Sequence, residues 1–211
     1  MGDPVPPSRR GRPRAGEREQ RQQRVLDAVL AELVEHGYDN ATTAGIASRA
    51  GVSKETLYSW FGSRDGLFEA LIRRNADASA ERVNAALDSD ADERATLIAY
   101  ASGLLTLLTG AGSIALNRAA MQSPQLAELL LRAGRHRIGP LVERYLAALH
   151  AAGRLHVPDP PAAFRLLYGL VVQDTQIRVL LGERPPSRRA IAAHAEAAID
   201  RFIHLAEIDR H

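Results

Sequence analysis

The sequence predicts an all-α protein in which a three-helix N-terminal domain, built around a helix-turn-helix, precedes a larger helical bundle. Apolar residues recur at helical spacing along almost the whole chain, and no stretch alternates apolar and polar residues as a half-buried strand does. Hydrophobic residues make up 45% of the 211 residues, which is enough to bury a core in one or two domains. The segment TTAGIASRAGVSKETLYSWF at residues 42–61 contributes two short helical patterns joined by a tight turn.

Start and stop signals place the helices in order. Ser, Thr or Asp before an apolar periodic run marks a helix start, proline suits the first helical position, and glycine marks an end. Asp90 and Glu93 are expected to form the capping pair of a buried helix that ends at the break Gly110-Ala111-Gly112. The other expected helices cover residues 18–36, 42–50, 54–61, 64–87, 113–122, 124–153 with a kink at Gly139-Pro140, 160–182 and 188–207.

The turn at residues 51–53 carries the most specific local chemistry. Thr42 can cap the helix before the turn, and Ser53 can cap the helix after it. Gly51 permits the left-handed backbone that ends a helix in a tight turn, and Val52 fills the corner. Two helices joined in this way form a helix-turn-helix, whose second helix enters the DNA major groove.

The second helix has one side for the core and one side for a partner. At about 100° per residue, Leu57 and Phe61 lie on the packing side, with Trp60 and the stem of Lys54 beside them. Hydroxyl and phenol groups on the opposite side suit contacts with phosphates and base edges. The alternative is an ordinary surface helix with solvated polar residues. The outward residues are Glu55, Thr56, Tyr58 and Ser59.

Residues 25–71 closely resemble the TetR/AcrR family of bacterial transcriptional regulators. The resemblance is carried by an amphipathic first helix ending in Gly37-Tyr38, then Ile46-Ala47, GVS, TLYxxF and residues 63–67 (SRDGL); beyond this quarter of the chain it extends only to the layout. It implies that Tyr58 and Arg64 hold DNA phosphates and that Thr42 and Thr43 touch the DNA backbone. The residues that it implies face DNA are Lys54, Thr56, Tyr58, Ser59 and Trp60.

The sequence departs from the family pattern at three positions. Ala44 and Gly45 stand where the family often carries a base-reading polar residue, and Gly45 lowers the helix propensity by about 1 kcal/mol relative to Ala. The first of the two helices is therefore expected to position the domain rather than to read bases. An acid at Glu55 meets phosphate repulsion unless it accepts from a cytosine amine, which makes it a candidate for sequence specificity.

Positive charge concentrates at the N-terminus. The net charge is only +2, yet residues 1–24 hold seven Arg against three acids, and the charges from residue 76 onward cancel. Arg10-Gly11-Arg12-Pro13 matches the core of an AT-hook, in which Arg side chains lie in a narrow A·T-rich minor groove. The alternative is a basic tail that only aids solubility. We expect Arg10 and Arg12 to contact DNA from this arm.

Residues 95–117 carry no charged side chain, a length that could also suggest a membrane span. Thr, Ser and Gly residues dilute the segment, so a helix buried among other helices is the better interpretation. By resemblance, such a helix lines a cavity for a small apolar or amphipathic effector. The expected ligand-binding residues are Tyr100, Leu104, Asn117, Met121, Gln122, Tyr168 and Gln173.

By resemblance, the last two long helices, about 161–181 and 188–207, form a four-helix dimer interface. A palindromic operator read by paired helices requires a dimer. The same apolar stripes are equally compatible with intrachain core. The expected interface residues are Phe164, Val171, Ile191, Ala195, Ile199 and Phe202.

No catalytic constellation is found. The chain has no Cys, its seven His show no metal-ligand spacing, and nucleotide-binding or serine-hydrolase motifs are absent. The polar N-terminus shows no secretory signal, so we expect a cytoplasmic protein without membrane association, metal or cofactor.

The sequence as a whole predicts a homodimeric, effector-released regulator, most simply a repressor, that binds a palindromic double-stranded DNA operator. Its expected parts are an arm at 1–17, a DNA-binding domain at 18–63 and a ligand-binding and dimerisation domain at 64–211. Two alternatives remain open, namely a non-specific architectural DNA-binding protein and a helical small-molecule-binding protein or enzyme.

Overall fold

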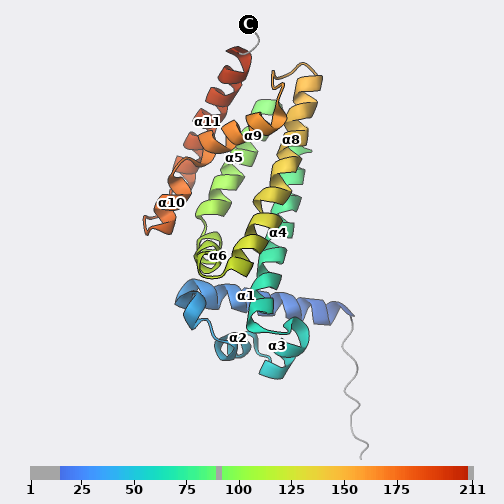
Figure 1. Cartoon of the computed structure of the whole chain (residues 1–211), viewed down its shortest axis with the longest axis vertical. Helices are drawn as coiled ribbons and strands as arrows, with labels where there is room; N and C mark the ends of the chain where they lie inside the picture. Colours follow the sequence, from blue (N-terminus) through green and yellow to red (C-terminus); the bar gives the residue numbers. More distant parts are fainter. Residues whose placement is uncertain (1–14, 89–91, 209–211) are drawn as a thin grey trace, which may run out of the picture.

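The computed structural model describes residues 15–88 and 92–208, and the described residues form helices joined by short connections (Figure 1). The first three helices lie together at one end of an elongated molecule, and α4 runs from them into a helical bundle at the other end. The helices are α1 (Ala15–Asn40), α2 (Thr43–Ala50), α3 (Lys54–Phe61), α4 (Arg64–Leu87), α5 (Glu93–Thr109), α6 (Ala111–Gln122), α7 (Pro124–Ala133), α8 (Arg135–Ala151), α9 (Pro160–Val172), α10 (Thr175–Leu180) and α11 (Arg188–Ile208).

One hydrophobic cluster holds α1, α2 and α3, which we call the head, to the start of α4. Helices α6 and α7 also contribute side chains to it, so the head packs directly on the helices above it. We call this group the N-terminal cluster. Its buried members are Val25, Leu26, Ala28, Val29, Leu33, Ala41, Ile46, Ala47, Leu57, Leu67, Phe68, Leu71, Ile72, Leu116, Ala119, Ala120, Leu126 and Leu129.

A second cluster, the C-terminal cluster, forms the core of the bundle between α5, α8, α9 and α11. It is separate from the N-terminal cluster; the start of α4 belongs to the N-terminal cluster, and Val83 and Leu87 near its end pack against the C-terminal cluster. Its buried members are Leu97, Tyr100, Ala101, Leu105, Val142, Leu146, Leu149, Leu155, Val157, Phe164, Leu167, Val171, Val172, Ile191, Ala195, Ala198, Ile199, Phe202 and Ala206.

Three expected boundaries are wrong. The helix predicted over 124–153 is two helices, because the backbone at Gly134 (φ −91°, ψ −99°) ends α7 before α8 begins. Pro140 lies inside α8. The helix predicted over 160–182 breaks at Gln173, whose φ of 45° ends α9. The cap of α5 is Asp92, whose carboxylate accepts the Ala95 N–H at 2.7 Å; Asp90 lies outside the described residues.

The uncharged segment is divided between α5 and α6. Within the described ranges no single helix is long and apolar enough to cross a membrane, and the α5–α6 pair, which reaches that length together, is bent by 58°. Leu97, Ala101 and Leu105 of α5 are buried in the C-terminal cluster. The apolar side chains of α5 therefore pack in the core of the bundle.

Candidate DNA-binding face and effector pocket

Side-chain caps set the geometry of the helix-turn-helix. The Thr42 hydroxyl accepts the Gly45 N–H at 3.0 Å at the start of α2, and the Ser53 hydroxyl accepts the Thr56 N–H at 3.2 Å at the start of α3. Between them Gly51 takes the left-handed conformation (φ 65°, ψ 38°) that the sequence predicts. These bonds satisfy helix-end N–H groups and fix how α3 projects from the head.

Helix α3 has a buried and an exposed side as expected, but Lys54 is exposed rather than placed beside the packing side, and Thr56 is less exposed than expected. Leu57 is buried in the N-terminal cluster, and Trp60 and Phe61 pack against its edge. Tyr58 is 47% exposed at the opposite side. Thr56 is half-buried and bonds to the Ser53 hydroxyl at 3.1 Å. The residues fully on the outer side are Lys54, Glu55, Tyr58 and Ser59.

Glu55 is held on the N-terminus of its own helix. Its pKa is lowered, first by a hydrogen bond from its own backbone N–H and then by one from the Ser53 hydroxyl. A carboxylate at this place complements the positive end of the helix dipole. This arrangement gives Glu55 a role in holding α3, beside the role in base specificity that the sequence suggested.

An open groove beside α3 contains a cation that the sequence analysis did not single out. Arg21 of α1 lies there with residues of the turn and of α3, including Ser53, Thr56 and Ser59. An exposed guanidinium next to the outward side of α3 suits a phosphate contact. The sequence offered no signal for it, because Arg18 and Arg24 on the same helix look equivalent until the fold is known.

Arg64 is bonded within the protein. Its guanidinium donates to the Ala41 carbonyl at 3.1 Å and to the Tyr38 carbonyl, and it lies 4.3 Å from the centre of the Tyr38 ring and 5.1 Å from that of Phe68. The Tyr38 hydroxyl donates to Asp65 at 3.1 Å. These contacts join the end of α1 to the start of α4. The phosphate contact implied by the family resemblance stays a prediction, and the structure adds a structural role.

Gly45 faces α1. A Cβ atom at this position would lie 2.5 Å from Oε2 of the buried Glu32, which accepts from Arg49 Nε at 3.1 Å. Arg49, the cation of α2, also pairs with Glu35. The small residue at 45 is thus explained by close packing, while Ala44 is exposed. Thr42 is exposed and Thr43 half-buried at the start of α2, and Arg10 and Arg12 lie outside the described residues.

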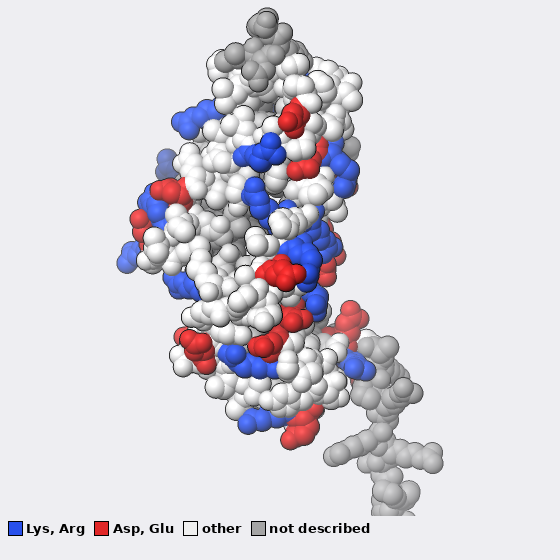
Figure 2. Space-filling view, viewed as in Figure 1, with Lys and Arg blue, Asp and Glu red and all other residues white. Residues whose placement is uncertain are grey.

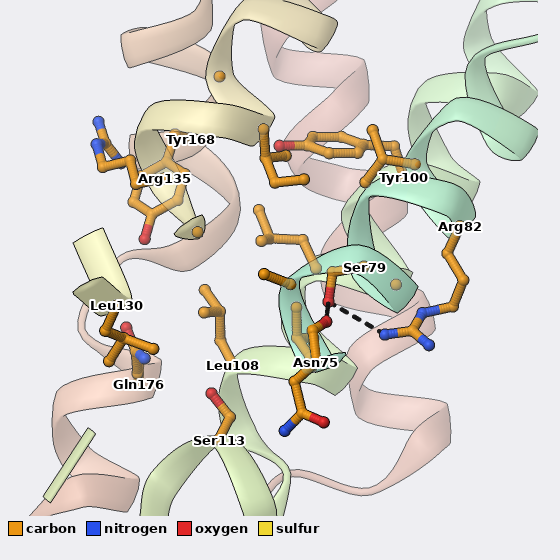
Figure 3. A pocket seen from close by; sticks show the side chains of 18 of the residues that line it. Asn75, Ser79, Arg82, Tyr100, Leu108, Ser113, Leu130, Arg135, Tyr168 and Gln176 are labelled. Carbon is orange, nitrogen blue, oxygen red and sulfur yellow. Dashed lines mark hydrogen bonds between the residues drawn. The ribbon is translucent and has the colours of Figure 1, made fainter. Parts of the chain in front are cut away.

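A cavity of about 360 Å³ opens between α4, α5, α6, α7, α8 and α9, with Gln176 of α10 also at its wall (Figure 3). Its walls are mostly apolar, and four of the expected ligand-binding residues line it: Tyr100, Leu104, Asn117 and Tyr168. Volumes of about 300–1,000 Å³ with apolar walls and a few polar groups are typical of small-molecule sites. The sequence analysis missed the polar residues Asn75, Ser79, Arg82, Ser113, Arg135 and Gln176.

Three expected ligand residues are not part of this cavity. Met121 is 69% exposed and Gln122 is also exposed, because the cavity is reached from α6 one turn earlier, at Asn117. Gln173 is exposed at the end of α9. These three assignments are wrong for this cavity.

Most polar groups at the cavity wall have partners within the protein. The Ser79 hydroxyl donates to the Asn75 carbonyl at 2.7 Å and accepts from Arg82 Nη2 at 3.2 Å (Figure 3). Asn117 Nδ2 donates to the Ser113 carbonyl at 2.8 Å. The Arg135 guanidinium lies over the Tyr168 ring, 4.2 Å from its centre. Across the described ranges, no group of three or more His, Asp or Glu side chains could hold a metal ion.

The residues expected at the dimer interface are buried within the chain. Each belongs to the C-terminal cluster and is at most 6% exposed, so none is free to contact a second copy. The intrachain alternative for these apolar stripes is therefore the right one. The residues concerned are Phe164, Val171, Ile191, Ala195, Ile199 and Phe202.

Comparisons with known protein families match both the N-terminal helices and the C-terminal bundle of the chain. Residues 25–71 match the family described as bacterial regulatory proteins, tetR family, and residues 95–205 match the AefR-like transcriptional repressor C-terminal domain. The HTH-type transcriptional regulator BetI of Paraburkholderia phymatum is 30% identical over 59% of this chain and 64% of its own length. The chain spans less than two thirds of the length of the curated relatives it matches first.

Two solved structures are similar over most of the chain. A TetR transcriptional regulator from Agrobacterium tumefaciens is 36% identical, with a TM-score of 0.69 over 88% of this chain and 93% of that one. The flavonoid-responsive regulator FrrA is 26% identical, with a TM-score of 0.63 over 89% of this chain and 97% of that one. The similarity thus extends through the head and the helical bundle.

Proposed function

The chain belongs to the TetR family of bacterial transcriptional regulators, which are not enzymes, and from that premise we propose that it is an effector-released repressor. In this proposal a homodimer binds a palindromic operator through two copies of α3, and a small amphipathic molecule in the cavity releases it. The observation that carries the proposal is that α4 takes part in both sites. Its start is buried in the N-terminal cluster, and its middle lines the cavity.

The coupling route runs along α4 and α6. Leu67, Phe68 and Leu71 anchor the start of α4 in the N-terminal cluster, while Ala76 and Ser79 lie at the cavity. Leu116 of α6 belongs to that cluster and also lines the cavity. A molecule that binds more tightly to one arrangement of these helices shifts the equilibrium toward that arrangement of the head. The free energy of this shift cannot exceed the difference between the molecule's binding free energies for the two arrangements.

DNA affinity is proposed to come from α3, Arg21 and the N-terminal arm. Residues 15–63 hold five basic and seven acidic side chains, and Arg49 among them is paired with Glu35. Lys/Arg and Asp/Glu are also intermingled on the face shown in Figure 2. Most of the long-range attraction to phosphates must then come from the arm, where residues 1–14 hold four Arg and one Asp.

The experiment that tests this function is footprinting on the DNA that flanks the gene, over a salt series. We expect one discrete protected palindrome, with half-sites about 34–36 Å apart, and affinity that falls steeply with salt. Continuous protection without a palindrome would favour the architectural alternative. An absence of salt-dependent DNA affinity would favour a helical protein that does not use DNA.

The proposed dimer face lies on the outward sides of α9 and α11, which pack against each other and are linked by His194 Nε2 and the Val171 carbonyl at 2.9 Å. Apolar and small side chains are exposed there, and small residues let two helices approach closely. This face replaces the buried residues expected from the sequence. Its exposed residues are Leu166, Gly169, Ala193, Ala197 and Leu205.

We expect Ala197→Glu to weaken the dimer at least tenfold, because it places a charge in the middle of a small-residue helix contact. Sedimentation equilibrium from about 0.1 to 50 μM measures the dimer dissociation constant. Ala148→Glu on α8 is the matched control, since Ala148 is also an exposed helical alanine. If both variants dimerise as tightly as the parent chain, the α9–α11 face is not the interface.

A further inference from the structure

The charges around the cavity have one sign. Arg82 and Arg135 both line it, and among the lining residues that the structure describes none is Asp or Glu. In Figure 3 Arg135 stands beside Tyr168 on one side of the cavity, while Arg82 reaches toward Ser79 on the other. A cavity with this charge attracts anions and disfavours cations.

Arg135 differs from the nearby arginines Arg132 and Arg137 because it has no carboxylate partner among the described residues. Arg132 pairs with Glu128, and Arg137 pairs with Asp77 of α4. The guanidinium of Arg135 has only the rings of Tyr168 and Phe164 beside it, with no carboxylate within ion-pair distance among the described residues. Its N–H donors are therefore available to a ligand, and its position is held by stacking on Tyr168.

Tyr100 provides a second donor that the protein itself does not use. Its side chain is only 3% exposed, and its hydroxyl forms no hydrogen bond with another described residue. Figure 3 shows the hydroxyl directed toward the side of the cavity where Tyr168 and Arg135 stand. Burial, followed by the influence of Tyr168, raises the pKa of this hydroxyl above its usual value, so that it stays protonated and can donate. Among the described residues no fully buried side-chain nitrogen or oxygen lacks a hydrogen-bond partner, so the unpartnered Tyr100 hydroxyl must reach the open space of the cavity, where a ligand can accept from it.

We propose that the effector of this cavity is an amphipathic acid, whose anionic head is bound by Arg135 and the Tyr100 hydroxyl and whose apolar body lies against Leu104, Leu107 and Leu108. This inference rests on the proposed function, because it assigns a chemical class to the molecule that releases the repressor. Hydrogen bonds from a guanidinium to a carboxylate are about twice as strong as neutral ones, so the head group should set the preference for an acid over its neutral amide. The leucines come from α5, and they offer an apolar wall without further donors.

The test is calorimetric titration of the full chain with acids and their primary amides. The panel contains the straight-chain acids from octanoate to dodecanoate and the aryl acids 4-phenylbutyrate and 2-naphthylacetate, each with its amide. We expect at least one acid to bind with micromolar affinity and its amide to bind at least tenfold more weakly. The proposal is overturned if no acid binds below 1 mM, or if the amides bind as tightly as the acids.

Two variants assign the head-group site. Arg135→Met should reduce the preference for acid over amide at least tenfold, while Arg132→Met, which removes a paired arginine nearby, should leave it unchanged. Tyr100→Phe removes only the hydroxyl and should weaken the acid severalfold and the amide less, because a carboxylate is the stronger acceptor. Circular dichroism establishes that each variant is folded. A folded Arg135→Met protein that keeps the full acid preference contradicts the assignment.

Operator binding without ligand, measured in parallel, separates this inference from the proposed function. Discrete, salt-dependent operator binding together with no acid binding overturns the amphipathic acid and leaves the repressor. Acid binding by a protein that protects no discrete operator supports the acid site and overturns the repressor. Acid binding that leaves operator affinity unchanged overturns the acid as the releasing effector.

Discussion

Phe68→Ala is expected to lower the free energy of unfolding by about 3–5 kcal/mol, the range found for removing a fully buried aromatic ring. Phe68 is fully buried, and its ring lies 5.0 Å from the Tyr38 ring and 5.1 Å from the Arg64 guanidinium. Because it fixes α4 to α1, the change also loosens the head. Urea unfolding measures the loss, and each 1 kcal/mol corresponds to about 2–4 °C in Tm for a chain of this size.

Val34→Ala is the matched control for this change. Val34 lies on α1, one of the two helices that Phe68 joins, but it is 43% exposed. Its truncation should therefore change the free energy of unfolding by about 0.5 kcal/mol or less. Operator affinity below the unfolding temperature should fall for Phe68→Ala and stay unchanged for Val34→Ala. A loss of under 1 kcal/mol for Phe68→Ala would contradict the view that this ring anchors α4 to the head.

Local chemistry made the helix-turn-helix predictable. The Thr42 and Ser53 caps and the Gly51 turn are formed by atoms within a few residues of each other, so the spacing of residue types was sufficient. The start of α4 at Arg64 was predictable for the same reason, since Ser63 caps it through a bond from the Gly66 N–H. Elements whose geometry is decided by neighbours in sequence are the ones that a single sequence specifies.

Partners distant in sequence could not be identified in the same way. Arg135 and Tyr100 line one cavity only because α5 and α8 pack side by side with α9. An apolar stripe shows that a helix side is buried, but it does not show what buries it, and so Phe202 could be assigned equally to a dimer or to the core. The break at Gln173 needs a positive φ that this residue type does not announce.

Gly45 shows how the fold changes the meaning of a residue. By the pattern alone, its lack of a side chain indicated a helix that positions rather than reads. The structure shows that Glu32 and its bond to Arg49 occupy the space that a side chain would need. The glycine is thus part of the contact between α1 and α2, and DNA contacts by Thr42 and Thr43 at the start of α2 stay a prediction.

Arg64→Met is expected to lower the free energy of unfolding by about 2–4 kcal/mol. The change leaves the carbonyls of Tyr38 and Ala41 without their charged donor and removes the cation stacked on the Tyr38 ring. Methionine keeps much of the apolar volume, so the loss reports the hydrogen bonds and the charge. Urea unfolding measures it, with Arg144→Met on the exposed side of α8 as the control.

The salt dependence of operator binding distinguishes this structural role from a phosphate contact. Each phosphate contact adds about 0.9 to the slope of log K against log salt, so removing a contact lowers the slope by about that amount. Arg21→Ala should lower it by about 1, because Arg21 lines the groove beside α3 and has no ion-pair partner among the residues that the structure describes. Arg64→Met, measured where it is fully folded, should leave the slope nearly unchanged, because its guanidinium already has its partners within the head. If Arg64→Met instead lowers the slope by about 1 with little loss of stability, Arg64 is a phosphate ligand. Its role is then the one that the family resemblance implies, not the one that its contacts in the free protein indicate.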